Sequence, residues 1–251
     1  MTGADHDLVR VEVGDDGVAV LTLADPDRRN ALRLEMTRAL AAAVGTALAA
    51  EVGAIVLTAD PPVFCSGGSL DDLLAPRAPL EESYVGMLAL AEAPVVTIAA
   101  VGGAAIGAGV NLPLACDVVV ASPAARFDPR WLDVGIHPGG GHLWRLERRV
   151  GRQAAAALVL CGERVDGRQA ERIGLAWRCV DTDDELLPEA HRLAARAAAR
   201  DRALVQRTKA TLRATVDQPD VTSALDLELQ AQQWSMAQPH FHETLARLRP
   251  R

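Results

Sequence analysis

Two glycine-rich turns, each preceded by an apolar strand-like run, constrain the fold of this chain more than any other feature. The first turn is Phe64-Cys65-Ser66-Gly67-Gly68-Ser69-Leu70, and the second is Ala105-Ile106-Gly107-Ala108-Gly109-Val110-Asn111. The apolar runs before them span residues 54–58 and 94–100. A strand that breaks into a glycine turn and then a helix leaves backbone N–H groups without partners. Two such turns can supply one N–H group each to a single developing oxyanion, which indicates acyl chemistry.

The rest of the chain alternates between strand and helix patterns. Residues 8–13 and 18–23 flank Gly14-Asp15-Asp16-Gly17, which predicts a hairpin. A helix is predicted over 34–50, a mobile loop over 74–82 and a helix over 83–92, with further strands at 54–58, 95–100, 118–120 and 176–180. This order implies stacked ββα units with mostly parallel pairing, an α/β fold. From residue 188 the pattern is helical, with helices expected over 193–199, 204–212 and 224–236.

Composition excludes several classes of protein. A net charge of −7 and the lack of a basic stripe argue against a nucleic-acid partner. The four cysteines show no metal-ligand spacing, so reduced thiols, a cytoplasmic location and no metal are expected. Residues 93–116 carry no charge but are broken by prolines and glycines, which indicates a buried segment and no membrane span. An anionic ligand would meet local cations, either in the group Arg28, Arg29 and Arg33 or in the tail group Arg247, Arg249 and Arg251.

Several short motifs together resemble the enoyl-CoA hydratase/isomerase (crotonase) superfamily. They are Arg29-Asn30-Ala31-Leu32, the segment 64–70, and Gly107-Ala108-Gly109 running on to Ala115-Cys116-Asp117. The pattern continues through Phe127, Gly135, Pro138 and Gly139-Gly140-Gly141, so that the resemblance covers nearly the whole chain.

The resemblance implies a crotonase-like spiral of ββα units over residues 1–187. It implies a C-terminal helical region over 188–251 that covers the active site and supports a homotrimer or a hexamer (dimer of trimers). The substrate is an acyl-CoA thioester, so coenzyme A is part of the substrate and no separate cofactor is expected. The N–H groups of Gly68 and Ala108 hold the thioester oxygen and stabilise an enolate. The residues expected to bind the substrate are Arg29, Ala31, Ser66, Gly68, Ser69, Leu70 and Ala108.

The acid/base residues of this chain depart from the pattern of the resembled family. Asn111 and Trp131 stand at the two positions where the hydratases carry glutamates, and Gly139 replaces a carboxylate found in some isomerases. Asn does not exchange a proton near neutral pH, and the Trp indole is only a donor. Ordinary hydratase activity is therefore doubtful. The resemblance further indicates that Trp131 faces a bulky or aromatic acyl chain.

Four titratable residues remain near the expected pocket. His137 is the candidate acid/base, because imidazole titrates near neutral pH, and Asp133 is expected to orient its ring. The alternative is a loop histidine that only hydrogen-bonds the backbone. Asp128 is expected to brace the loop, and His142 to face away from the pocket.

Two function classes stay open at this point. The first is an acyl-CoA-processing enzyme of the hydratase/isomerase type with an altered acid/base set. The second is a non-catalytic acyl-CoA binding or carrier protein. A dinucleotide site at Gly107-Ala108-Gly109 is rejected, since Leu112 stands where the third glycine is needed.

Overall fold

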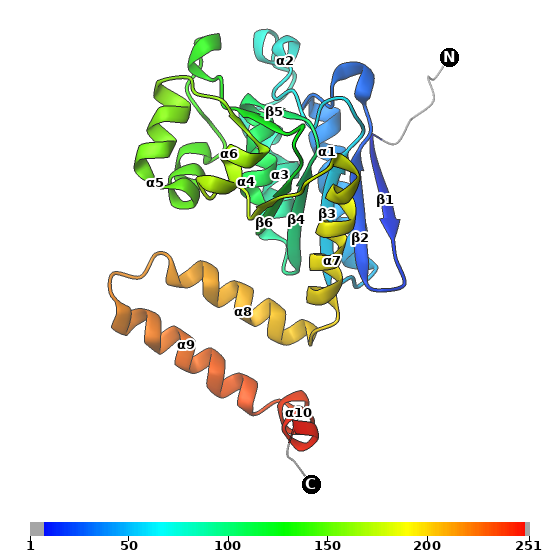
Figure 1. Cartoon of the computed structure of the whole chain (residues 1–251), viewed down its shortest axis with the longest axis vertical. Helices are drawn as coiled ribbons and strands as arrows, with labels where there is room; N and C mark the ends of the chain where they lie inside the picture. Colours follow the sequence, from blue (N-terminus) through cyan, green and yellow to red (C-terminus); the bar gives the residue numbers. More distant parts are fainter. Residues whose placement is uncertain (1–7, 249–251) are drawn as a thin grey trace.

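A six-stranded sheet forms the centre of the molecule in the computed structural model, which describes residues 8–248 (Figure 1). Its strand order is β1-β2-β3-β4-β6-β9. Only β1 (Val9–Val13) and β2 (Val18–Leu23) pair antiparallel, as the predicted hairpin. The parallel strands are β3 (Ala54–Ala59), β4 (Val96–Val101), β6 (Val118–Ala121) and β9 (Arg178–Cys179). The predicted α/β fold is confirmed.

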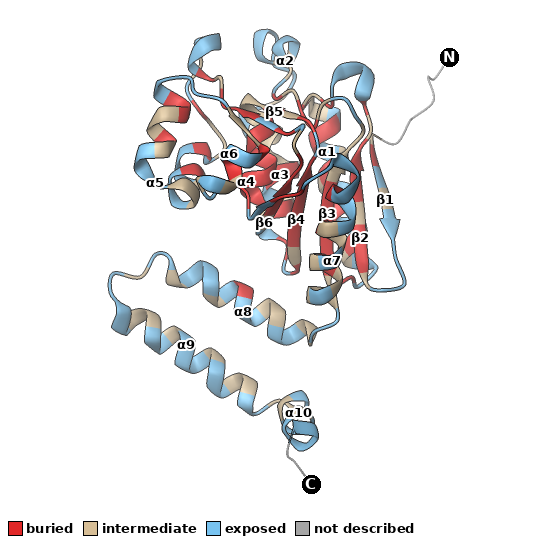
Figure 2. Cartoon of the chain, in the orientation of Figure 1, coloured by how far each residue is buried: buried red, intermediate tan, exposed pale blue. Residues whose placement is uncertain are grey.

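Alternate residues of the parallel strands enter two different apolar cores. In β3, Ile55 and Leu57 pack in the larger core with α1 (Leu34–Ala49) and α3 (Val85–Glu92). Ala54 and Val56 face the opposite side, where α7 (Leu186–Ala198) covers the sheet with Leu186, Ala190 and Ala194. This two-residue alternation is the geometry of an extended strand buried on both faces. Figure 2 shows the resulting concentration of buried residues in the sheet.

A second, small sheet lies beside the two glycine turns. It contains β5 (Ala104–Ile106), β7 (Arg126–Asp128) and β8 (Val165–Asp166) in the order β5-β7-β8. The second turn continues into the 3₁₀ helix η3 (Gly107–Val110) and α4 (Asn111–Ala115). None of these three strands is predicted from the sequence, because two or three residues are too few to show a period.

The predicted mobile loop over 74–82 contains more structure than expected. It lies between α2 (Leu70–Leu74) and the 3₁₀ helix η2 (Leu80–Tyr84), and ion pairs join it to α1. The remaining helices of the core are α5 (His142–Leu160), which has a non-helical break at Gly151, and α6 (Gly167–Arg172). Short 3₁₀ turns lie at Pro26–Arg28, Leu132–Val134 and Asp183–Glu185.

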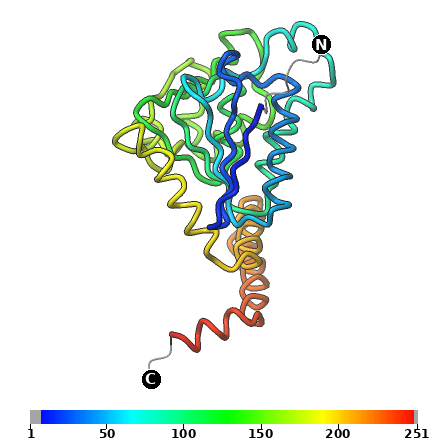
Figure 3. The backbone as a smooth tube through the Cα atoms, turned by 90° about the vertical axis from the view of Figure 1, so that its right-hand side faces the viewer, coloured from blue at the N-terminus to red at the C-terminus, as the bar shows by residue number. Residues whose placement is uncertain are grey.

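The three C-terminal helices extend away from the core (Figures 1 and 3). They are α8 (Arg202–Thr215), α9 (Val221–Met236) and α10 (Pro239–Leu248), and the first two correspond to predicted helices. The buried Lys209 of α8 attaches them to the core by hydrogen bonds to the Val95 carbonyl and to Asp117. Arg249 and Arg251, two of the tail cations named above, lie outside the described residues.

The boundary predicted between residues 187 and 188 falls within α7, which packs on the sheet. The helices that extend from the core therefore begin at α8. Their role as a cover of the site and in oligomer formation stays a prediction. Among residues 8–248, no helix combines the length and the apolar character needed to cross a membrane.

Candidate active site

The two glycine turns lock into each other through their backbones. The Cys65 amide donates to the Ala104 carbonyl at 3.0 Å, and the Ile106 amide donates to the Cys65 carbonyl at 2.9 Å. A Cβ on Gly67 would lie 2.4 Å from the Ile106 oxygen, and one on Gly109 would lie 2.3 Å from the Cys65 oxygen. Such separations are shorter than a van der Waals contact, so a side chain at either position would clash with the other turn. Glycine at 67 and 109 is what allows the two turns to touch.

The amides of Gly68 and Ala108 are among the donors of these turns that have no hydrogen-bond partner in the described chain. Gly68 is exposed, and Ala108 is half-buried as the second residue of η3. Within residues 8–248, neither amide donates a hydrogen bond to another protein group. The Ala108 nitrogen lies 3.3 Å from the point where a Gly67 Cβ would stand, which places it at the edge of the first turn.

The segment around Arg29 lies against the first turn. Arg29 and Asn30 adopt left-handed backbone conformations, with φ of 54° and 52°. The Ser66 amide donates to the Arg29 carbonyl at 3.0 Å, and the Leu32 amide donates to the Gly67 carbonyl at 2.8 Å. The structure thus brings the candidate binding residues Arg29, Ala31, Ser66, Gly68, Ser69 and Leu70 around one turn.

The buried Asn30 side chain holds this segment in place. Its Oδ1 accepts from the Asp25 amide at 2.9 Å, and its Nδ2 donates to the Asp60 and Val63 carbonyls. Asn tolerates the left-handed conformation better than most residues, which suits it to this position.

Arg29 differs from the other two cations named as possible anion ligands. Arg33 pairs with Asp25 at 2.9 Å, and Arg28 approaches the same carboxylate at 3.5 Å. Arg29 is exposed and makes no side-chain hydrogen bond or ion pair with another residue of the described chain. Of the three cations, Arg29 is therefore the one whose charge no nearby carboxylate neutralises.

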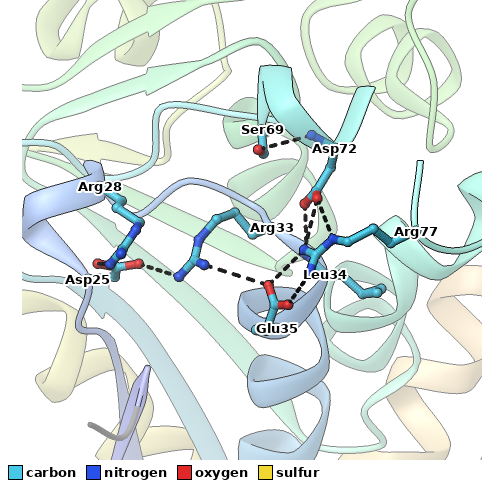
Figure 4. Close-up of polar contacts among 8 residues, drawn as sticks. All are labelled: Asp25, Arg28, Arg33, Leu34, Glu35, Ser69, Asp72 and Arg77. Carbon is cyan, nitrogen blue, oxygen red and sulfur yellow. Dashed lines mark hydrogen bonds and ion pairs between the residues drawn. The ribbon is translucent and has the colours of Figure 1, made fainter. Parts of the chain in front are cut away.

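A network of charged side chains fixes α2, which directly follows the first turn (Figure 4). Arg77 binds Glu35 of α1 at 2.6 Å and Asp72 of α2 at 2.8 Å. Asp72 also accepts from the Leu34 amide at the start of α1, and the Asp72 amide donates to the Ser69 hydroxyl. The hydrogen bond from Arg77 lowers the pKa of Glu35 to about 2.

Asn111, Trp131 and His142 form a buried cluster at the end of the second turn. Asn111 begins α4, which directly continues η3, and it follows Ala108 of η3 by three residues. Residues with this spacing lie on the same side of a helical segment. Its Oδ1 lies 2.7 Å from Nδ1 of His142, and its Nδ2 donates to the Gly139 carbonyl at 3.1 Å. The rings of Trp131 and His142 pack edge to face, with their centroids 5.5 Å apart.

The prediction that His142 faces away from the pocket is wrong. The side chain is 1 % exposed and contacts Asn111 and Trp131, the two residues predicted to stand at the altered acid positions. Gly140 and Gly141, with φ of 68° and 74°, turn the chain so that α5 begins with His142 at this point. A Cβ on Gly140 would lie 3.0 Å from Asn111 Nδ2, so that glycine is also needed for space.

His137 and Asp133 are not brought together. His137 is exposed, and its Nδ1 lies 2.8 Å from the Pro138 carbonyl, which is the backbone contact of the alternative interpretation. Asp133 is exposed and lies 3.8 Å from Arg164. Arg164 also approaches Asp128 at 3.2 Å, which fits the bracing role expected of Asp128. Among the described residues, no group of three or more His, Cys, Asp or Glu side chains could hold a metal ion.

Comparison with known proteins matches residues 14–249 to the model of the enoyl-CoA hydratase/isomerase family. This chain belongs to that family. It is 42% identical to a probable enoyl-CoA hydratase of Mycobacterium tuberculosis, over 97% of this chain and 98% of the relative.

Solved structures agree with this family membership. The crystal structure of enoyl-CoA hydratase from Mycobacterium smegmatis superposes with a TM-score of 0.87 at 32% identity, covering 97% of this chain and 98% of that one. The crystal structure of a putative enoyl-CoA hydratase from Streptomyces coelicolor A3(2) superposes with a TM-score of 0.86 at 32% identity, covering 100% of this chain and 95% of that one. The crotonase-like fold is therefore confirmed for this member of the enoyl-CoA hydratase/isomerase family.

Proposed function

We propose that the protein processes acyl-CoA thioesters and stabilises a thioester enolate with the amides of Gly68 and Ala108. The observation that carries the proposal is the pair of unpaired N–H groups in two interlocked turns. When a base removes a C2 proton, or a nucleophile adds at C3, negative charge develops on the thioester oxygen. Fixed donors stabilise that charge without any reorganisation during the reaction.

The neighbouring residues suit the coenzyme A part of the substrate. Arg29 supplies a positive charge beside the first turn, and coenzyme A carries phosphates. Ser66, Ser69 and Leu70 surround the same turn, and the ion pairs of Arg77 hold α2 in position. The relatives described above are named as enoyl-CoA hydratases, which supports a thioester of this kind.

The altered acid/base set distinguishes the proposed enzyme from a hydratase with two glutamates. Asn111 and Trp131 supply no carboxylate, and Asp133 and His137 are exposed and separate. We therefore expect enolate chemistry with slow hydration of simple enoyl-CoA. The exposed apolar side chains of α9, including Val221 and Leu225, are consistent with the proposed homotrimer or hexamer.

Two substitutions at Gly68 test the oxyanion hole. Gly68→Pro removes the N–H donor, whereas Gly68→Ala keeps it, and the new Cβ would meet only Leu73 Cδ1 at 3.9 Å. Loss of one oxyanion donor costs about 10²–10³ in rate. We expect Gly68→Pro to slow solvent-deuterium exchange at C2 of butyryl-CoA by that factor, with Gly68→Ala near wild type.

The result also separates an enzyme from a carrier protein. Equal exchange rates in the Pro and Ala variants would contradict the oxyanion hole. Binding of acyl-CoA by wild type without any exchange or turnover, for every thioester tried, would favour the non-catalytic binding protein.

A further inference from the structure

Two buried polar atoms in the Asn111, Trp131 and His142 cluster have no partner. They are the indole Nε1 of Trp131 and the imidazole Nε2 of His142. Trp131 is 8% exposed and His142 is 1% exposed. A buried polar group without a hydrogen bond costs about 1–3 kcal/mol, so each such group needs an explanation, and a catalytic role with a bound ligand supplies one.

The hydrogen bonds of Asn111 define the chemistry of each atom. The Gly139 carbonyl can only accept, so Asn111 directs its Nδ2 toward it and presents Oδ1 to the histidine. Nδ1 of His142 is therefore the protonated nitrogen. Burial lowers the pKa of His142 to about 4, which keeps the ring neutral at pH 7. Nε2 is then a lone-pair acceptor, while Nε1 of Trp131 is a donor.

A single ligand atom bonded to both groups would have to donate one hydrogen bond and accept another. A hydroxyl-type oxygen does this, whereas a carbonyl oxygen or a methylene group does not. Within the proposed function, two such oxygens are available near C3 of the acyl chain. One belongs to the water that adds to an enoyl-CoA, and the other is the hydroxyl of a 3-hydroxyacyl-CoA.

The geometry points to His142 as the proton-transfer residue of this enzyme, with Trp131 holding the same hydroxyl-type oxygen through its indole N–H. The inference rests on the proposed function. In the addition step, Nε2 takes a proton from water while the oxygen bonds to C3. The C2–C3 π electrons move toward the thioester oxygen at Gly68 and Ala108, and the imidazolium then returns its proton to C2. One water is consumed, and His142 ends neutral.

The test uses two substitutions with matched controls. His142→Asn keeps a donor for Asn111 and removes the Nε2 lone pair, and Trp131→Phe removes the indole N–H but keeps an aromatic ring. His191→Asn and Trp177→Phe make the same changes outside the cluster, where His191 is half-buried beside Asp16 and Trp177 is exposed. Circular dichroism and thermal unfolding establish that each variant is folded.

The first readout is the ratio of affinities for 3-hydroxybutyryl-CoA and butyryl-CoA, measured by calorimetry. Two added hydrogen bonds predict a wild-type preference of about tenfold for the hydroxyl compound. Each cluster variant removes one of the two hydrogen bonds and should lower this preference to about threefold, while it binds butyryl-CoA within about threefold of wild type. Both control variants should keep the full preference.

The second readout is solvent-deuterium exchange at C2, which should fall about 10²–10⁴-fold in His142→Asn. If exchange falls and the affinity ratio stays as in wild type, the inference is supported and the oxygen bound by the cluster is that of water. If the affinity ratio falls as well, the oxygen bound is the hydroxyl of the 3-hydroxyacyl-CoA.

Two outcomes overturn the inference. One is that both cluster variants match wild type in both readouts. The other is that exchange survives in His142→Asn but is lost in His137→Gln, which would assign the proton transfer to His137. If neither thioester binds wild type, the proposed function itself fails, which is a distinguishable result.

Discussion

The two halves of the candidate site are built in different ways. One half is backbone, formed by the amides of Gly68 and Ala108 in two turns that glycines lock together. The other half is side chain, formed by Asn111, Trp131 and His142. The backbone half depends on glycine at positions 67 and 109, whereas the side-chain half depends on the residue types at positions 111, 131 and 142.

If the proposed function holds, this difference explains how one fold can bind a thioester in the same way while its proton chemistry changes. The amides of Gly68 and Ala108, the proposed oxyanion donors, require only that Gly67 and Gly109 stay small. The acid/base groups can be replaced without disturbing those turns, as Asn111 illustrates by bonding to both Gly139 and His142. The predictions that follow test the two halves and then the ion pairs of α2.

The largest expected effect concerns hydration of crotonyl-CoA. Each general acid or base contributes about 10²–10⁴-fold, and Asn111 and Trp131 stand at the positions where we predict the two hydratase glutamates. We expect hydration to be at least about 10²-fold slower than in a family member that carries both glutamates, assayed side by side by absorbance. Equal turnover would show that the side-chain half supplies protons as well as two carboxylates do.

The next effect concerns the pH dependence of stability. The pKa of His142 is about 4 in the folded chain, against an unfolded value near 6.5. The unfolded chain therefore binds this proton first, so the free energy of unfolding falls as the pH drops from 6.5 to 4. Urea titrations at several pH values measure this change in the free energy of unfolding. Between pH 6.5 and pH 4 it should be up to about 3 kcal/mol larger in wild type than in His142→Asn. Parallel pH profiles would refute a buried neutral imidazole.

Glycine substitution tests the backbone half. In Gly109→Ala, the new Cβ would lie 2.3 Å from the Cys65 oxygen, which forces the turns apart. We expect a loss of about 1–3 kcal/mol in unfolding free energy together with a loss of activity. Gly45→Ala, within α1, is the control. A Cβ at this position would meet no atom within 4 Å, and alanine stabilises a helix relative to glycine. Similar stability of the two variants would contradict the interlocked turns.

The smallest effect concerns the ion pairs of α2. Glu35→Gln removes a carboxylate whose pKa Arg77 lowers to about 2. The side chain is 44% exposed, so solvent screening limits the loss to about 1 kcal/mol or less. This contribution is present above pH 4.5 and disappears as the pH falls toward 2. The difference from wild type should therefore shrink in acid and in high salt, and a constant difference would exclude an electrostatic origin.

The backbone half of the site could be predicted from the sequence to a large extent. Gly67 and Gly109 stand in turns after apolar runs, and the spacing of those runs predicts parallel strands β3 and β4. The contact between the turns could not be predicted, because it depends on β5, a strand of three residues.

The side-chain half was predicted only in part. The sequence marks Asn111 and Trp131 as altered positions, but it favours His137 over His142 because His137 stands on the loop expected to line the acyl pocket. The direction of His142 depends on left-handed backbone at Gly140 and Gly141. Three consecutive glycines permit many conformations, so that the sequence does not define which one positions the helix that follows.

The most direct test of the account is a crystal structure of the wild-type protein with 3-hydroxybutyryl-CoA. The account predicts the thioester oxygen at about 2.7–3.1 Å from both the Gly68 and Ala108 nitrogens. It also predicts the 3-hydroxyl within hydrogen-bond distance of His142 Nε2 and Trp131 Nε1. A thioester oxygen bonded to neither amide, or an acyl chain directed away from His142, would contradict it.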